Sequence, residues 1–204
     1  MVEYKTEQER FWAEEFGDEY CKRNTSIIKS NINFFSKVFN RVKNVNSVIE
    51  FGSNIGMNLH ALNKIFDLEL SAIEINKTAV KQLEKLDFIK NIYNESLLEI
   101  NLNEKFDMTF IKGVLIHINP KYLDIVYEKL YTYSNRYILI AEYYNPTPVE
   151  VPYRGFESKL FKRDFAGEIL DKFDDLNLVD YGFLYHRDNN FPQDDISWFL
   201  LEKK

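Results

Sequence analysis

The stretch Ser47-Val48-Ile49-Glu50-Phe51-Gly52-Ser53-Asn54-Ile55-Gly56-Met57-Asn58-Leu59 decides how this chain folds. A short apolar run ends in an acid, passes through two glycines four residues apart and continues as a helical pattern. This order predicts a buried strand, a tight turn and the N-terminus of a helix. Gly52 suits backbone angles that other residues avoid, and Gly56 allows the helix start to lie close to a ligand or to the strand. The free N–H groups of a helix start favour a carboxylate or a phosphate.

After Val45 the chain alternates between strands and helices. We expect strands at 46–51, 70–75, 88–93, 106–111 and 137–142, and helices at 56–66, at 76–86 and from Asn119-Pro120 onward. This alternation predicts parallel strands joined by right-handed crossovers, with helices on both faces. A helix near 162–173 then precedes strands at 176–186 and 196–202, whose connection leaves no room for a helix and predicts an antiparallel pair. The expected fold is α/β and Rossmann-like, a seven-stranded, mostly parallel sheet with a C-terminal antiparallel hairpin.

Residues 1–44 contain no predicted strand. Apolar residues recur at helical spacing over 5–16 and 18–23, with Gly17 as the break, and again from about 25 to 43. We expect an N-terminal helical lid over a site, and the alternative is a helical layer packed on the sheet. Residues 45–204 form the sheet core, and the absence of linkers and repeats predicts a single domain over 1–204.

Composition excludes several classes of protein. The net charge of −6 argues against a nucleic-acid groove, which is normally strongly basic. The single cysteine, Cys21, excludes internal disulfides, and isolated histidines without cysteine partners predict no metal site. No apolar run is long enough to cross a bilayer, and Met1-Val2-Glu3-Tyr4-Lys5 lacks a signal-peptide core. We therefore expect a cytoplasmic protein that binds neither nucleic acid nor membrane.

The ends of the predicted strands carry the residues that point to a ligand. In an open α/β sheet, ligands bind outside the carboxyl ends of the strands, where the strand order reverses. Glu50 ends the first strand, and Glu74 ends the second, 22 residues after Gly52, where an acid accepts hydrogen bonds from ribose hydroxyls. The segments after the next three strands are Asn94-Glu95-Ser96-Leu97, Lys112-Gly113 and Glu142-Tyr143-Tyr144. We expect the first of these to contact an adenine ring.

The two acids favour S-adenosylmethionine (SAM) as the ligand. Glu50 suits the ammonium group of its methionine part but would repel the pyrophosphate of NAD or FAD. These dinucleotides also normally need a third glycine in the turn, at the position of Asn54. The predicted SAM contacts are Glu50, Gly52, Ser53, Asn54, Gly56, Glu74, Ile75, Ser96, Leu97, Lys112 and Gly113.

Further motifs resemble the pseudaminic acid biosynthesis-associated methyltransferases. They are Phe11-Trp12, 16–20, Arg23-Asn24, 112–120, 153–155, 160–167, 180–183, 185–188 and 191–195, so the resemblance covers nearly the whole chain. It implies a class I SAM-dependent methyltransferase linked to a bacterial nonulosonic-acid sugar pathway, such as flagellar or surface glycan synthesis. Asn54 departs from the middle glycine of the common SAM motif. The identity of the acceptor stays open.

Methyl transfer from a sulfonium depends above all on holding the reacting atoms in line. A sugar hydroxyl would also need a general base, for which the candidates are His117 and His186, with Glu142 behind them, whereas an amine can react without one. His117 as a capping or core residue is the competing interpretation.

An anionic sugar or nucleotide sugar calls for arginines, which bind carboxylates bidentately, and for residues at the mouth of the site. The acceptor-binding candidates are Tyr20, Arg23, Asn24, Tyr143, Tyr144, Arg154 and Arg187. For Arg187 the alternative is an internal salt bridge in a turn. The other functions considered are methylation of another small molecule or a protein side chain, and a catalytically inactive SAM-fold binding partner.

Overall fold

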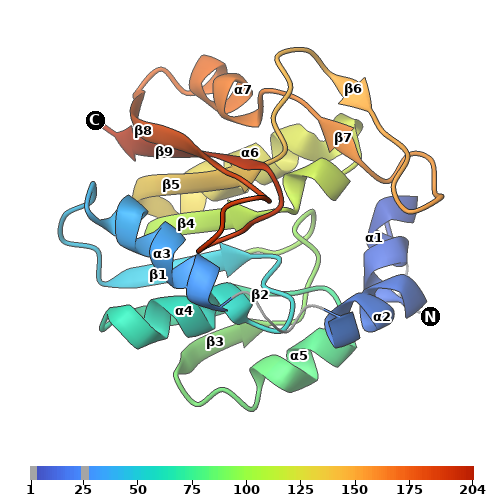
Figure 1. The fold of residues 1–204 in the computed structure, drawn as a ribbon, viewed down its shortest axis with the longest axis horizontal. Coiled ribbons are helices and arrows are strands. Elements are labelled where there is room, and N and C mark those ends of the chain that lie inside the picture. Colours follow the sequence, from blue (N-terminus) through green and yellow to red (C-terminus); the bar gives the residue numbers. More distant parts are fainter. Residues whose placement is uncertain (1–3, 24–27) are drawn as a thin grey trace.

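The computed structural model describes residues 4–23 and 28–204. Its centre is a seven-stranded sheet with the order β3-β2-β1-β4-β5-β9-β8 (Figure 1). The strands are β1 (Ser47–Phe51), β2 (Glu69–Ile73), β3 (Ile89–Tyr93), β4 (Phe106–Lys112), β5 (Ser134–Glu142), β8 (Leu176–Leu184) and β9 (Ile196–Lys203). Strands β1 to β5 pair in parallel, whereas β9 runs antiparallel to its neighbours β5 and β8. The predicted mostly parallel sheet with a C-terminal antiparallel pair is confirmed.

Helices cover both faces of this sheet (Figure 1). Side chains alternate along each strand, so Val48 joins one apolar cluster and Ile49 the other. The first cluster includes buried residues of three helices, α3 (Ile28–Phe39), α4 (Met57–Ile65) and α5 (Lys77–Leu83). The second includes those of α6 (Leu123–Tyr133) and α7 (Phe165–Lys172). Each fully buried Leu, Ile or Phe contributes about 1.5–3 kcal/mol, so the two clusters account for most of the driving force for folding.

The strand order places a crevice at the carboxyl ends of β1 and β4. From β1 the chain proceeds to β2 and β3 on one side, and it then returns to add β4 and β5 on the other side. Such a reversal leaves the loops after the two central strands diverging, which opens a binding crevice between them.

Helices α1 (Glu7–Ala13) and α2 (Glu15–Arg23) lie apart from the two helical layers, and α2 contacts α5 (Figure 1). The prediction that Gly17 separates them is wrong, because the break falls at Glu14, whose backbone leaves the helical region at φ −108° and ψ −148°. Gly17 lies inside α2, where a Cβ would meet the Trp12 carbonyl oxygen at 1.9 Å and Asn76 Nδ2 at 2.8 Å. This glycine therefore permits close contact between the segments.

The predicted lid over 1–44 divides into two parts. Residues of α1 and α2 line the cavity described below, so the lid stays a prediction for these two helices, which are called the lid helices from here on. In α3, by contrast, Phe34, Phe35 and Val38 are buried in the apolar cluster that covers the sheet. The alternative of a helical layer therefore holds for α3, because its apolar stripe faces strands and α4 rather than a ligand.

Two regions differ from the predicted element bounds. The helix expected from Asn119-Pro120 begins at Leu123, after short 3₁₀ turns at Leu115–His117 and Pro120–Tyr122. Between β5 and α7 the chain forms an unpredicted two-stranded ribbon of β6 (Val149–Glu150) and β7 (Phe161–Lys162). The segment that connects β6 to β7 reaches α1, where Gln8 Nε2 donates to the Ser158 carbonyl oxygen at 2.8 Å (Figure 1). Within the described ranges, no helix combines the length and the apolarity needed to span a membrane.

Candidate functional site

The turn after β1 borders a cavity at the crevice between β1 and β4. Gly52 and Gly56 have φ values of +77° and +81°, a region that strongly favours glycine. The amides of Gly52 and Ser53 both donate to the Ile73 carbonyl oxygen, which fixes the turn against β2. Gly52, Ser53 and Asn54 line the cavity. Gly56 does not, because it packs against α5, where an added Cβ would meet Leu83 at 2.8 Å.

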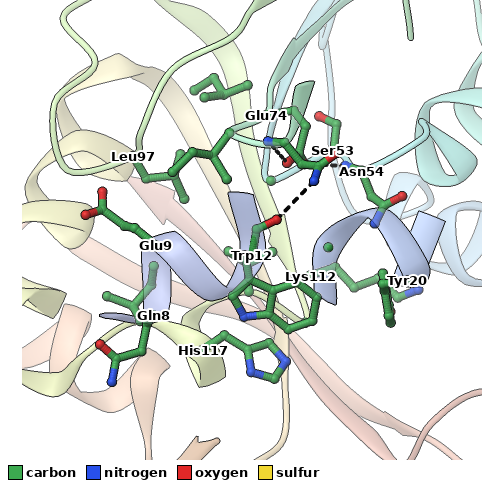
Figure 2. A pocket seen from close by; sticks show the side chains of 18 of the residues that line it. Gln8, Glu9, Trp12, Tyr20, Ser53, Asn54, Glu74, Leu97, Lys112 and His117 are labelled. Carbon is green, nitrogen blue, oxygen red and sulfur yellow. Dashed lines mark hydrogen bonds between the residues drawn. The ribbon is translucent and has the colours of Figure 1, made fainter. Parts of the chain in front are cut away.

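Glu74 follows β2 and presents its carboxylate at the cavity wall. Its Oε2 accepts a hydrogen bond from the Asn54 amide at 2.7 Å, and its Oε1 accepts one from the Asn76 amide at 2.7 Å (Figure 2). The side chain is almost completely buried, and burial raises the pKa of the Glu74 carboxyl despite these amide donors. Each carboxylate oxygen has a second lone pair, so the group can also accept from a ligand hydroxyl.

The loop after β3 forms the adjoining wall. Ile75, Ser96 and Leu97 line the cavity as predicted, together with Glu95 and Leu98. The Ser96 hydroxyl donates to Glu9 of the lid helix α1, and Asn94 Nδ2 donates to the carbonyl oxygens of Glu74 and Ile75. The predicted adenine-binding segment is therefore tied both to the lid and to the end of β2.

Lys112 and Gly113 form the floor at the end of β4. Gly113 has a φ of +67° and no atom within 4 Å of the position that a Cβ would occupy, so this point of the cavity is open. Lys112 Nζ donates to Asn58 Oδ1 at 3.4 Å and to Asn31 Oδ1 at 3.1 Å. Asn58 also lines the cavity, although the sequence analysis did not single it out.

Glu50 lies beneath the turn and does not belong to the cavity lining. It is 1% exposed, its Oε1 accepts from Asn58 Nδ2 at 2.6 Å, and its Oε2 is buried without a hydrogen-bond partner among the described residues. Burial raises the pKa of the Glu50 carboxyl to about 8. The structure thus connects Glu50 to the cavity through Asn58.

The lid is fastened by Asn76, the N-cap of α5. Asn76 Oδ1 accepts from the Ala79 amide at 2.8 Å, while Asn76 Nδ2 donates to the carbonyl oxygens of Trp12 and Ala13 at 3.2 and 3.3 Å. A third contact, at 3.0 Å, joins Nδ2 to Asp18 of α2. The sequence signal for Asn76 was its position as a helix cap, which contains no information about the lid.

Trp12 and His117 face each other in the cavity (Figure 2). Their ring centroids are 4.5 Å apart, and Trp12 Nε1 is buried without a hydrogen-bond partner in the described part of the chain. His117 Nδ1 lies 2.6 Å from the Lys159 carbonyl oxygen, which can only accept, so Nδ1 carries the proton and Nε2 is the basic nitrogen. Burial lowers the pKa of His117 to about 4, so the ring is neutral at pH 7. His117 thus lines the cavity but is only 7% exposed, and its role as a general base stays a prediction.

Glu142 is turned toward backbone rather than toward the cavity. Its Oε1 accepts from the amides of Val114 and Leu115, both at 2.9 Å, and it does not line the cavity. Burial raises the pKa of the Glu142 carboxyl to about 7. The contacts are those of a residue that holds the 3₁₀ turn containing His117.

Of the other predicted acceptor and catalytic residues, Tyr20 lines the cavity. The structure leaves Tyr143, Tyr144, Arg154, Arg187 and His186 outside the lining. His186 is exposed and pairs with Asp195 at 2.7 Å, because both belong to the turn between β8 and β9. Arg154 lies over the Tyr153 ring. Arg23 ends α2 without a described side chain, and Asn24 lies outside the described residues.

The charged residues of the described lining are mainly acidic. Besides the residues already named, it contains Thr6, Gln8, Gly17, Ile55, Met57, Ile73, Val114, Ile118, Asn119, Asp194 and Ile196. Lys112 is the one lysine or arginine among the described lining residues, against the carboxylates of Glu9, Glu74, Glu95 and Asp194. No group of three metal-ligating side chains occurs in the part of the chain that the structure describes.

These residues fit SAM. The Glu74 carboxylate suits the ribose, the segment Ser96–Leu98 lines the same cavity for the adenine, and Gly113 leaves open space at the end of β4 beside Lys112. Gly52 itself is close to Val114, where a Cβ would meet its side chain at 2.7 Å, so the turn needs this glycine for packing as well as for its backbone angles.

No protein-family model matches this chain, and no curated protein matches it in sequence. Solved structures do match in fold. A SAM-bound magnesium protoporphyrin IX methyltransferase from Synechocystis is 11% identical, with a TM-score of 0.65 and full coverage of both chains. A SAM-bound amino pentose methyltransferase from Micromonospora echinaspora is 8% identical, with a TM-score of 0.65 over 93% of this chain and 96% of that one.

A third match is 1,6-didemethyltoxoflavin-N1-methyltransferase from Burkholderia thailandensis, with bound S-adenosylhomocysteine. It is 10% identical, with a TM-score of 0.69 over 97% of this chain and 87% of that one. These identities establish a shared architecture rather than a shared substrate. The chain has the fold of the class I SAM-dependent methyltransferases.

Proposed function

We propose that this protein transfers the methyl group of SAM to a small-molecule acceptor. The observation that carries the proposal is the Glu74 carboxylate, which two backbone amides hold at the cavity wall beside the Gly52 turn. An acid in this position binds the ribose of an adenosine ligand in α/β folds of this type. The match in fold to SAM-dependent methyltransferases supports the same conclusion.

The residues that would hold SAM come from four strand ends. Glu74 would bind the ribose, Ile75 with Ser96 and Leu97 would enclose the adenine, and the Gly52–Asn54 turn with Lys112 and Gly113 would hold the methionine part. Bound SAM supplies an electrophilic methyl group on a positively charged sulfur. The protein's own contribution is then to position the acceptor, which supplies on the order of 7–11 kcal/mol.

His117 is the proposed general base for a hydroxyl acceptor. Its Nδ1 donates to the Lys159 carbonyl oxygen, which leaves Nε2 able to take a proton. The Trp12 ring packs against His117, with the two ring centroids 4.5 Å apart. General base catalysis of this kind is worth about 10²–10⁴-fold in rate.

For the acceptor we propose a nonulosonic acid sugar of the pseudaminic acid type, or its nucleotide-activated form. Support comes from the sequence resemblance, whose motifs include Trp12, Tyr20 and the segment 112–120 that line the cavity in part. One structural neighbour is an amino pentose methyltransferase, so this fold accommodates sugars. We place the reaction in the cytoplasm of a bacterium, where SAM and nucleotide sugars are available.

A second acceptor class is favoured by the charge of the lining. Four carboxylates face the cavity against one lysine, which suits an acceptor bearing an amine better than one bearing several negative charges. Amine methylation needs no general base, so the two classes predict different roles for His117.

The decisive experiment has two stages. In the first stage, thermal melting is measured with and without SAM or S-adenosylhomocysteine. A bound ligand should stabilise the folded protein by about 2.7 kcal/mol when its concentration is a hundredfold above Kd. Identical melting with and without either ligand would favour a binding partner that does not use SAM. Incubation of isotopically labelled SAM with nonulosonic acids, their nucleotide-activated forms and amino sugars should then give one product heavier by a single methyl group, whereas labelling of protein side chains alone would contradict the small-molecule assignment.

A further inference from the structure

Lys112 is one of the residues proposed to hold the methionine part of SAM, and its contacts indicate which group of SAM it would meet. It is the last residue of β4, and its ammonium donates to amide oxygens of Asn58 and Asn31, at 3.4 and 3.1 Å. An ammonium has three N–H donors, and these two hydrogen bonds among the described residues use two of them. Since Lys112 lines the cavity, a third donor is available for a ligand there.

Lys112 fixes where a negatively charged group of a ligand can bind in this cavity. Among the described lining residues, Lys112 is the one fixed cation, so a negatively charged group in this cavity has a single strong partner. Asn58 lies in the first turn of α4, directly after the Gly52–Gly56 turn. Lys112 therefore lies at the end of the cavity near the start of α4.

We propose that Lys112 binds the α-carboxylate in the amino-acid part of SAM, and that Asn58 and Asn31 hold its ammonium in place. The inference rests on the proposed function and adds the residue that reads the amino-acid end of the cofactor. An arginine or lysine at a carboxylate forms a charge-assisted hydrogen bond, the strongest type available in such a site.

Asn58 links this carboxylate site to Glu50. Its Oδ1 accepts from Lys112, and its Nδ2 donates to Glu50 Oε1 at 2.6 Å. The Asn58 side chain thus bridges a buried acid and a half-buried ammonium.

Asn31 brings two distant segments to the same lysine. Its Oδ1 accepts from Lys112 and also from Gln193 Nε2 at 3.1 Å, so α3 and the turn between β8 and β9 both support the site. Asn31 is fully buried, and its Nδ2 has no hydrogen-bond partner among the described residues. We therefore assign Asn31 as a positioning residue.

Three acids influence the protonation of the Lys112 ammonium. Burial lowers the pKa of Lys112 to about 8, while Glu50, Asp194 and Glu142 act in the opposite direction. A ligand carboxylate next to the ammonium would add to those charges and keep Lys112 protonated at neutral pH.

The test compares two ligands that differ in one group. S-adenosylhomocysteine carries the carboxylate, and decarboxylated S-adenosylhomocysteine keeps the adenosine and the amine but lacks it. By titration calorimetry, the wild-type protein should bind the first about 10- to 100-fold more tightly, as expected for a charged hydrogen bond. In Lys112→Met this affinity ratio, the preference for S-adenosylhomocysteine over its decarboxylated form, should fall to about threefold or less, because the ligand carboxylate no longer meets an ammonium group.

Two control variants separate this role from a general loss of structure. Glu74→Gln removes the charge proposed to bind ribose and one of the two backbone contacts to Asn54 and Asn76, but no contact to Lys112, so it should weaken both ligands by the same factor. Lys162→Met removes a lysine that lies over the Tyr143 ring outside the cavity lining, and it should leave the ratio as in the wild type. Asn31→Leu should reduce the ratio while retaining the lysine charge.

Equal binding of the two ligands by the wild-type protein would overturn the inference even if Lys112→Met does not fold. A Lys112→Met protein that still prefers the carboxylate would also overturn it. In both cases the binding of S-adenosylhomocysteine itself would leave the proposed function intact. If the wild-type protein binds neither ligand, the proposed function fails together with this inference.

Discussion

The side-chain amide of Asn76 donates to the backbone carbonyl oxygen of Trp12 across 3.2 Å, while the Asn76 backbone amide donates to Glu74 at 2.7 Å. One residue therefore connects the lid helix to the acid proposed to bind ribose. The position of α1 therefore depends on the conformation of the chain directly after β2.

Replacing Asn76 should loosen the lid. Asn76→Ala removes the α5 cap and the contacts to α1 and α2, and we expect a loss of about 1–2 kcal/mol in the free energy of unfolding. Asn76→Ser is the matched control, because serine can cap α5 but cannot donate to Trp12 at the same time. Backbone amides of residues 7–23 should exchange their hydrogens faster in both variants. Unchanged exchange in Asn76→Ser would show that the contact between Asn76 and Trp12 does not hold α1 in place.

Glu74→Gln should weaken cofactor binding. The amide can accept from one backbone N–H but loses the charge that strengthens bonds to ribose hydroxyls, so we expect about a 10- to 100-fold rise in the Kd of S-adenosylhomocysteine. Glu95→Gln changes the same charge at another lining position and should have a much smaller effect. Calorimetric titration of the two variants checks this, and equal losses would show that only the net charge matters.

His117→Asn should separate chemistry from binding. For a hydroxyl acceptor, we expect a rate loss of about 10²–10⁴-fold with little change in the affinity for S-adenosylhomocysteine. A variant that keeps its rate would indicate an amine acceptor or a purely structural histidine. Single-turnover methyl transfer, measured beside a calorimetric Kd, distinguishes these outcomes.

The buried His117 also predicts a pH dependence of stability. Its folded pKa of about 4 is below the ordinary value of 6.5, so the unfolded chain binds more protons in between. The stabilising contribution is complete above pH 6.5 and is lost as the pH falls toward 4, by at most about 1.4 kcal/mol per pH unit. Urea unfolding of the wild type and of His117→Asn at several pH values checks this prediction. The free energy of unfolding should change less with pH in the variant between pH 4 and pH 6.5, and equal pH dependences would contradict the prediction.

The buried Glu142 predicts the opposite pH dependence, a stability that falls as the pH rises. Burial raises its pKa to about 7, so its contribution is complete below the ordinary value of 4.5 and is lost as the pH rises through 7. Glu142→Gln can still accept from the Val114 or Leu115 amide without carrying a charge, so its stability relative to wild type should increase between pH 5 and pH 8. Denaturant unfolding at both values checks this.

Activity of the same variant separates the two roles of Glu142. If the residue only holds the turn that carries His117, Glu142→Gln should keep its methyl-transfer rate within about threefold, since no proton transfer is lost. A loss as large as that of His117→Asn would instead assign Glu142 to the chemistry.

Much of the architecture follows from patterns that are local in sequence. The alternation of strands and helices after Val45 predicted the strands and their parallel direction, because side chains in a strand repeat every two residues and in a helix every 3.6. The turn at Gly52–Gly56 and the acid at Glu74 were also visible, since glycine and a strand-end acid are recognisable where they stand. The ribbon β6–β7 was not, because two strands of two residues leave no periodic signal.

The candidate site was only partly predictable for the same reason. Ser96, Lys112 and His117 follow strand ends, and the sheet brings them to one cavity as expected. Arg154, Arg187 and His186 belong to motifs of the resembling family, yet they lie outside the cavity lining. Arg154 lies over the Tyr153 ring of its own loop, and His186 pairs with Asp195 of its own turn.

The sequence by itself determined the sheet, the glycine turn and the acid that follows β2, because each depends on residues next to one another in the chain. Only the tertiary structure decided that Trp12 covers His117, that Asn58 bridges Glu50 and Lys112, and that Asn31 supports the same lysine. These contacts join α1, α3 and α4 to strand ends far away in sequence, and their energies depend on burial and charge that exist only after the chain has folded.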